Sequence, residues 1–194
     1  IYVSIMLLKI RKGLMGELQF KIVSRKVEQS NFDCGIESIN ADIVNSYYPT
    51  ILQHAYAYSI IANNRIVGYF QIMFRDIELN DLPEDISEYD SGKKENKISA
   101  VHINFIAIDK RYHRNNLGTF TLRIIIEYVR QLTQRWPIRI ITIDARNELI
   151  HWYKEEGFLF MPHNRAGQDG VTRAMYMDCF RYQKELNDYI ESIS

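Results

Sequence analysis

The chain has few cysteines, no net charge and no long apolar run. Its 194 residues include only Cys34 and Cys179, too few for the disulfide framework of a small secreted protein. Lysine plus arginine and aspartate plus glutamate both number 24, so no global field draws the chain to nucleic acid or a membrane. The apolar run at residues 1–8 is too short to span a bilayer, and basic residues follow it, which reverses signal-peptide order. These absences favour a soluble cytoplasmic protein.

Metal-ligand and nucleophile patterns are also missing from the sequence. The histidines have no paired cysteine or carboxylate at metal-ligand spacing. Neither a Ser-His-Asp nor a Cys-His arrangement is supported. We therefore expect no metal.

The hydrophobic pattern predicts one domain over residues 16–194, after an N-terminal extension (1–15) to which we assign no structure. The expected strands are residues 18–27, 55–62, 65–79, 98–108, 138–144, 158–161 and 172–180. The expected helices are residues 36–48, 117–134, 147–156 and 181–193. Hairpin-like strands fill the first half, and strands alternate with helices in the second. This order predicts an α/β (mixed α+β) fold, a mixed sheet with helices on both faces.

Turn residues set several of these boundaries. Asn63 and Asn64 tolerate positive φ and suit a tight hairpin between two strands. Either Asp33 or Gly35 starts the first helix, and Pro49 interrupts it. The charged stretch 80–96 predicts a long surface loop.

The most informative stretch is residues 100–118 (AVHINFIAIDKRYHRNNLG), where a β-branched run ends in a basic turn that leads into a helix. This order places backbone N–H groups and the positive end of a helix dipole at the tip of a strand, which suits a phosphate-bearing ligand. The turn lacks the Lys-Ser/Thr of an NTP-binding loop and the three glycines of a dinucleotide fingerprint.

Three segments in this order resemble the GNAT superfamily of acetyl-CoA-dependent N-acetyltransferases. Residues 104–109 (NFIAID) match its bulged central strand, and residues 112–118 (YHRNNLG) lie at its Gln/Arg-x-x-Gly-x-Gly/Ala pyrophosphate turn. Residues 147–158 look like its Asn…Tyr-x-x-x-Gly-Phe ending. The resemblance spans roughly residues 18–180. It implies a mostly antiparallel sheet splayed at its middle strands.

The resemblance also implies where acetyl-CoA binds. The pantetheine arm pairs with strand backbone, and the pyrophosphate lies on N–H groups of the turn, aided by Arg114. The implied cofactor-binding residues are Ile106, Ala107, Ile108, His113, Arg114, Asn115, Asn116, Leu117, Gly118, Thr119 and Asn147. Read without the resemblance, the same residues are a buried central strand and a solvated basic turn. Two positions depart from the family pattern: His113 replaces Gln or Arg, and Asn116 replaces the first glycine. Asn tolerates left-handed backbone, but its side chain adds bulk beside the pyrophosphate.

Tyr153 is the candidate general acid under this resemblance, because the leaving CoA thiolate needs a proton donor. The alternative is an ordinary packed tyrosine. Asn147 either caps the helix that carries Tyr153 or binds cofactor.

His102 and Asn104 are the candidates for removing the proton from the acceptor amine. They lie two residues apart on one face of the central strand. His102 could take the proton directly, or both residues could hold a relay water; a structural histidine is the alternative.

The implied activity is transfer of acetyl from acetyl-CoA to an amine by direct attack in a ternary complex. The segment 32–46 and the loop 80–96 would line the acceptor side. Residues 32–35 (FDCG) followed by Ile39-Asn40 more faintly resemble GNAT-type toxins that acetylate aminoacyl-tRNA. Such a toxin and a non-catalytic CoA-binding or interaction protein are the alternatives. We expect an amine substrate, no membrane partner, and no nucleic acid except aminoacyl-tRNA in the toxin alternative. A homodimer remains open.

Overall fold

The computed structural model describes residues 18–27, 32–83, 86, 96–162, 170–180 and 191. These residues fall into two compact units. The first unit comprises residues 1–73 and 103–122, and the second comprises residues 74–102 and 123–194. The chain therefore passes between the units three times. The predicted extension 1–15, most of the loop 80–96 and nearly all of the helix 181–193 lie outside the described residues.

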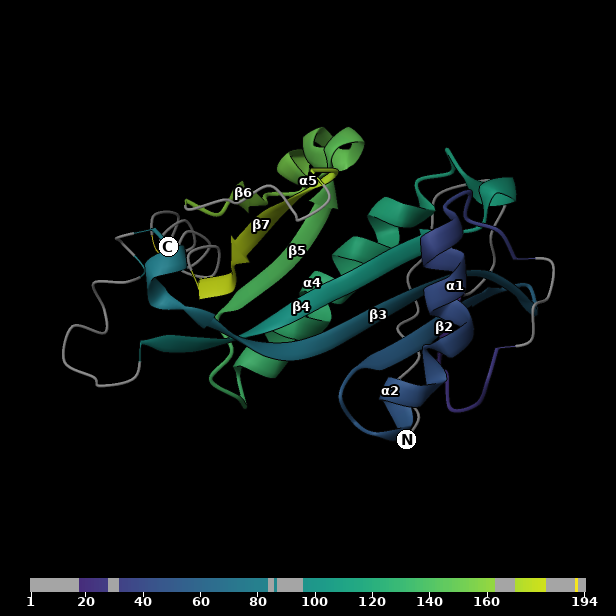
Figure 1. Ribbon diagram of the computed structural model, residues 1–194, viewed down its shortest axis with the longest axis horizontal. Coiled ribbons are helices and arrows are strands. Elements are labelled where there is room, and N and C mark those ends of the chain that lie inside the picture. The colour runs from purple at the N-terminus through teal and green to yellow at the C-terminus, as the bar shows by residue number, and fades with distance from the viewer. Residues whose placement is uncertain are drawn as a thin grey trace. The chain divides into compact units, whose positions relative to one another are not determined.

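The described elements alternate as the sequence pattern predicts (Figure 1). The strands are β1 (Leu18–Ile22), β2 (Tyr56–Ala62), β3 (Arg65–Glu78), β4 (Lys97–Ile108), β5 (Ile140–Arg146), β6 (Leu159–Phe160) and β7 (Thr172–Asp178). The α-helices are α1 (Glu37–Asn45), α2 (Tyr47–Ile51), α4 (Leu117–Thr133) and α5 (Ile150–Glu155). Single 3-10 turns are η1 (Leu79–Asp81), η3 (Lys110–Tyr112) and η4 (Asn147–Leu149).

The strands are hydrogen-bonded in the order β1-β2-β3-β4-β5-β7-β6. The pairs β1–β2, β2–β3, β5–β7 and β6–β7 are antiparallel. The predicted mixed, mostly antiparallel fold is confirmed. The splaying of the middle strands stays a prediction.

Two predicted boundaries of the first helical segment are wrong. The N-cap of α1 is Ile36, without a side-chain cap bond, rather than Asp33 or Gly35. Pro49 lies inside α2 rather than ending a helix. Proline fits there because it stands in the first helical turn, where its missing N–H would have no acceptor. The turn between the helices is held instead by Thr50, whose Oγ1 donates to the Ser46 carbonyl at 2.9 Å.

The core of the first unit lies between α1 and the strands β2 and β3. Ile43 of α1 is buried with Ala57 of β2 and Tyr69 of β3, and Phe105 and Ala107 of β4 join the same cluster. Figure 1 shows α1 and α2 lying against these strands. Helix α1 is therefore anchored through one apolar face, and its opposite face remains polar.

The hairpin between β2 and β3 confirms the predicted tight turn. Asn63 and Asn64 adopt φ of 48° and 59°, the left-handed values that asparagine tolerates. Further along β3, a Cβ added to Gly68 would lie 2.7 Å from the backbone oxygen of Ala107. Only glycine lets β3 approach β4 this closely, at the segment predicted to bind pantetheine.

The second unit has its own core. β5 pairs with β7 along its whole length, from Ile140 opposite Asp178 to Arg146 opposite Thr172. The buried cluster comprises Ile77, Leu79, Leu82, Ile86, Ala100, Ile140, Met161 and Tyr176. Leu82 and Ile86 come from the stretch predicted to be a surface loop. At least its described part is thus anchored rather than free at the surface.

Candidate functional site

The turn after β4 has the backbone form that an anion site needs. Arg114 and Asn116 adopt φ of 64° and 56°, in the left-handed region that asparagine tolerates. The amide of Phe120 donates to the Asn116 carbonyl at 2.9 Å, which opens helix α4. The first amides of α4, at Leu117 and Gly118, have no acceptor within the helix. Alternating left-handed residues ahead of such a helix start form a concave group of N–H donors.

The base of this turn is pinned by Asp109, which is completely buried. The Arg111 guanidinium donates to both carboxylate oxygens, from Nε to Oδ1 and from Nη2 to Oδ2, each at 2.8 Å. The Asp109 amide donates to the Val67 carbonyl at 3.0 Å. The turn is therefore tied to strand β3 as well as to β4.

A second network ties the turn to the segment before α1. Lys110 Nζ lies 2.6 Å from Asp33 Oδ2, and the Lys110 amide donates to the Asp33 carbonyl at 2.9 Å. Asp33 Oδ1 accepts from the Gly35 amide at 2.7 Å and from Asn40 Nδ2 at 2.9 Å. Asn40 Oδ1 in turn accepts from the Cys34 amide at 3.1 Å. The FDCG…Asn pattern thus joins the start of α1 to the basic turn.

These networks make the free energy of unfolding depend on pH in the acid range. Hydrogen bonds from Lys110 and Asn40 lower the pKa of Asp33, and those from Arg111 lower the pKa of Asp109. An aspartate whose pKa is lower in the folded state than in the unfolded chain, where it is about 3.9, stabilises the fold above that pH. This stabilisation is lost as the pH falls below about 3.9.

We expect the free energy of unfolding to decrease when the pH is lowered below about 4. The Asp33→Asn variant should have a lower free energy of unfolding at pH 7 than the wild type. Its free energy of unfolding should also decrease less as the pH is lowered, as measured by urea denaturation at a series of pH values. Equal slopes for both proteins would contradict this.

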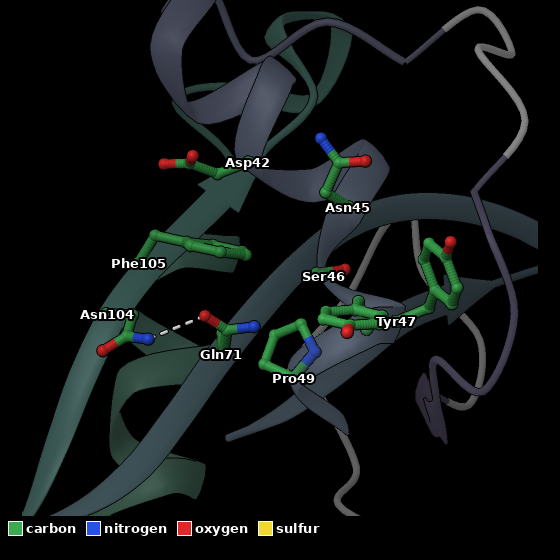
Figure 2. Close-up of a pocket in the computed structure, with 9 residues that line it drawn as sticks. Asp42, Asn45, Ser46, Tyr47, Pro49, Gln71, Asn104 and Phe105 are labelled. Carbon is green, nitrogen blue, oxygen red and sulfur yellow. Dashed lines mark hydrogen bonds between the residues drawn. The ribbon is translucent and has the colours of Figure 1, made fainter. Parts of the chain in front are cut away.

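A cavity of about 540 Å³ lies beside β4 in the first unit (Figure 2). Its lining residues are Asp42, Asn45, Ser46, Tyr47, Tyr48, Pro49, Gln71, Asn104 and Phe105. Asn104 Nδ2 donates to Gln71 Oε1 at 2.7 Å. Asn104 and Phe105 both line the cavity, although consecutive side chains of a regular strand point to opposite faces. This is consistent with the predicted bulge in β4.

The segment 32–46, expected on the acceptor side, contains Asp42, but sequence reasoning singled out neither Asp42 nor Gln71. Gln71 carried a usable signal, because it is a buried polar residue inside an otherwise apolar strand, GYFQIM. Asp42 carried none, because an acidic residue on the polar side of an amphipathic helix is ordinary.

His102 is buried in the second unit. Its Nδ1 lies 2.9 Å from Thr142 Oγ1, and its Nε2 lies 3.8 Å from Asp144 Oδ2. Burial and the nearby Arg75 lower the pKa of His102 to about 4, against the opposing effect of Asp144. The imidazole is therefore neutral at pH 7 and a weak base. Its role in proton removal stays a prediction.

Tyr153 is buried on α5 against aromatic neighbours. The centroid of its ring lies 4.5 Å from that of the Trp152 ring. It also meets the Phe158 ring edge-on, with the two centroids 5.6 Å apart. Burial raises the pKa of the Tyr153 phenol above its ordinary value near 10. The phenol thus stays protonated at neutral pH, as a proton donor must. The packing also suits the structural alternative, so its catalytic role stays a prediction.

Asn147 does not cap the helix, and that alternative is wrong. The N-cap of η4 is Arg146, with no side-chain cap bond. Asn147 Nδ2 donates instead to the Gly170 carbonyl at 3.1 Å, and its amide donates to the Val171 carbonyl at 2.9 Å. Asn147 therefore holds the entry to β7. The ring of His113 likewise contacts the end of β4, with Nε2 2.8 Å from the Ile108 carbonyl oxygen.

The described residues hold no group of three histidine, cysteine or carboxylate side chains that could bind a metal ion. Within the same residues, no helix is long and apolar enough to cross a membrane.

No family model and no curated protein matches the sequence. The fold, by contrast, is similar to solved structures. A bacterial toxin has a TM-score of 0.73 at 18% identity, covering 90% of this chain and 97% of the toxin. AtaT complexed with acetyl-methionyl-tRNAfMet has a TM-score of 0.71 at 19% identity, covering 88% and 99%. AtaTR bound with acetyl-CoA has a TM-score of 0.69 at 19% identity, covering 87% and 98%. The chain therefore has the same fold as these solved structures.

Proposed function

We propose that this protein is an acetyl-CoA-dependent N-acetyltransferase. The observation that carries the proposal is the turn after β4, where Arg114 and Asn116 adopt left-handed backbone just before the first amides of α4. A pyrophosphate fits such a group of donors, and the exposed Arg114 side chain adds a positive charge. The similar structure of AtaTR with bound acetyl-CoA supports the same ligand class.

The acceptor would enter through the cavity of the first unit. Its residues Asn104 and Phe105 directly precede Ile106, Ala107 and Ile108, which would pair with the pantetheine arm. An amine in this cavity would therefore lie beside the thioester end of the cofactor. Such an arrangement suits direct transfer in a ternary complex.

In the proposed reaction, the neutral amine attacks the thioester carbonyl carbon. The C–N bond forms, the C–S bond breaks, and the amine loses one proton to a base or to water. The thiolate leaves and takes one proton, for which we propose Tyr153 as the donor. The products are an N-acetylated amine and CoA.

The direct test is release of CoA thiol from acetyl-CoA in the presence of a panel of amines. We expect thiol release that depends on both substrates. Binding of acetyl-CoA without release on any acceptor would favour the non-catalytic alternative. Absence of acetyl-CoA binding would overturn both.

A second candidate acceptor is the α-amine of an aminoacyl-tRNA. It is favoured by the similar structure of AtaT with acetyl-methionyl-tRNAfMet. The test compares methionyl-tRNA with methioninamide at equal concentration. Much faster acetylation of the tRNA would support this candidate, and equal rates would oppose it.

Replacing Asn116 with glycine should tighten acetyl-CoA binding a few-fold. Glycine adopts φ of 56° without strain and removes the side chain that crowds the pyrophosphate. Asn116→Ala should instead lower stability by about 1 kcal/mol, because alanine disfavours left-handed backbone. Calorimetric titration and thermal unfolding measure the two effects. Weaker binding by the glycine variant would show that the asparagine side chain itself contacts the ligand.

A further inference from the structure

The cavity of the first unit differs in charge from the basic turn. Among its nine lining residues, Asp42 is the one acidic side chain, and none is basic. Within the described part of the chain, no Lys, Arg or His nitrogen is recorded within ion-pair distance of the Asp42 carboxylate. A phosphate or carboxylate ligand would meet an uncompensated negative charge there.

The amide pair in the cavity has a fixed orientation. Because Asn104 Nδ2 donates to Gln71 Oε1, the Asn104 carbonyl oxygen is left as an acceptor directed away from Gln71 (Figure 2). Gln71 is buried, so its side chain holds Asn104 in this orientation. The lining residues therefore include two kinds of acceptor, a carboxylate and an amide oxygen, both suited to N–H donors.

Aromatic side chains complete the wall. Phe105, Tyr47 and Tyr48 line the cavity with Asp42. Aromatic faces attract cations and also pack against apolar groups. The volume of about 540 Å³ exceeds what an ammonium group alone requires, so it leaves room for an apolar substituent.

We propose that this cavity binds the acceptor as a primary ammonium attached to an apolar or aromatic group, with Asp42 as its counter-ion and Asn104, positioned by Gln71, as a second acceptor. That the bound ammonium is the acetyl acceptor rests on the proposed function. It deepens that function by naming residues that select a cation. The first unit thus carries an anion site at the turn and a cation site in the cavity, both next to the last residues of β4.

The probe pair is phenethylamine and 2-phenylethanol. Both have the same aromatic group, but only the amine is cationic at pH 7. NMR titrations of the full chain should show saturable binding of phenethylamine with shifts at the cavity residues, and much weaker binding of the alcohol. Equal affinity for both probes, or no binding of the amine, would overturn the proposal.

The variant that tests the counter-ion is Asp42→Asn, which should weaken phenethylamine binding about tenfold, as expected for a hydrogen bond to a charged group. Glu37→Gln is the matched control, because it makes the same charge change on the same helix outside the cavity. Asp42→Glu keeps the charge and should retain binding within about threefold. Unchanged binding in Asp42→Asn, or an equal loss in the Glu37→Gln control, would overturn the assignment. Circular dichroism of each variant checks that it is folded.

The role of Gln71 is tested by Gln71→Met, which keeps the side-chain length and removes the acceptor for Asn104. As a positioning residue it should raise KM for the amine and leave acetyl-CoA binding unchanged. A loss of both would indicate a structural role and overturn the positioning claim.

These binding measurements contain no acetyl-CoA. If the amine binds through Asp42 but no thiol is released, the proposed function fails and the cation site stands. If acetyl transfer occurs with a KM insensitive to Asp42→Asn, the cation site fails and the proposed function stands.

Discussion

Tyr153→Phe should lower kcat for acetyl transfer by about a hundredfold or more, the usual scale of general acid catalysis. The change removes only the hydroxyl and keeps the ring that packs against Trp152 and Phe158. The leaving thiolate then loses its proton donor. Acetyl-CoA affinity and thermal stability should stay close to wild type. Thiol release measured at saturating concentrations of both substrates gives kcat directly.

Tyr128→Phe, a change on α4 away from the candidate site residues, is the matched control and should keep full activity. Burial raises the pKa of Tyr153, so ionisation of this phenol should not reduce kcat at any pH below its ordinary value near 10. An unchanged kcat in Tyr153→Phe would leave this tyrosine as a packing residue only.

Asp109→Ala should lower the free energy of unfolding by about 3 kcal/mol, at the lower end of the cost of breaking a buried ion pair. Asp109 is completely buried, and its removal leaves the bidentate donors of Arg111 without their acceptor. The Arg111 side chain is 55% exposed, so water can solvate it in part. Urea denaturation of both proteins at pH 7 measures the difference.

The same change should weaken acetyl-CoA binding, because Asp109 pins the turn that carries Arg114 and Asn116. Arg111→Ala, alone and combined with Asp109→Ala, completes a double-mutant cycle that isolates the energy of the pair. A loss below about 1 kcal/mol for Asp109→Ala would show that the buried carboxylate is not a structural anchor.

Much of the fold was predictable because its signals are local. The β-branched run before the basic turn predicted β4, and the helical spacing after it predicted α4, with ends within one residue of those observed. The Asn63-Asn64 pair predicted the hairpin through its tolerance of positive φ. The same tolerance allows the φ of 56° at Asn116.

Two errors can be traced in the structure. Pro49 reads as a helix end, but a break one turn earlier, at Ser46, makes it part of the first turn of α2. Asn147 reads as a cap, but β7 brings the Gly170 carbonyl within reach of its side chain. The second outcome depends on a tertiary contact, which the local pattern does not encode.

The candidate site was predicted unevenly for the same reason. The turn proposed to bind pyrophosphate is one continuous segment, so a sequence pattern can propose its residues. The cavity proposed to bind the acceptor combines α1, α2, β3 and β4, so Asp42 and Gln71 become candidates only when these elements pack together.

The most direct test is to incubate the purified protein with acetyl-CoA and one acceptor at a time. The acceptors are a panel of primary amines and methionyl-tRNA. The CoA thiol and the N-acetylated product are measured in the same reaction. We predict equal amounts of thiol and acetylated product on at least one acceptor. Thiol release without N-acetylated product, or no release on any acceptor, would contradict the assignment as an N-acetyltransferase.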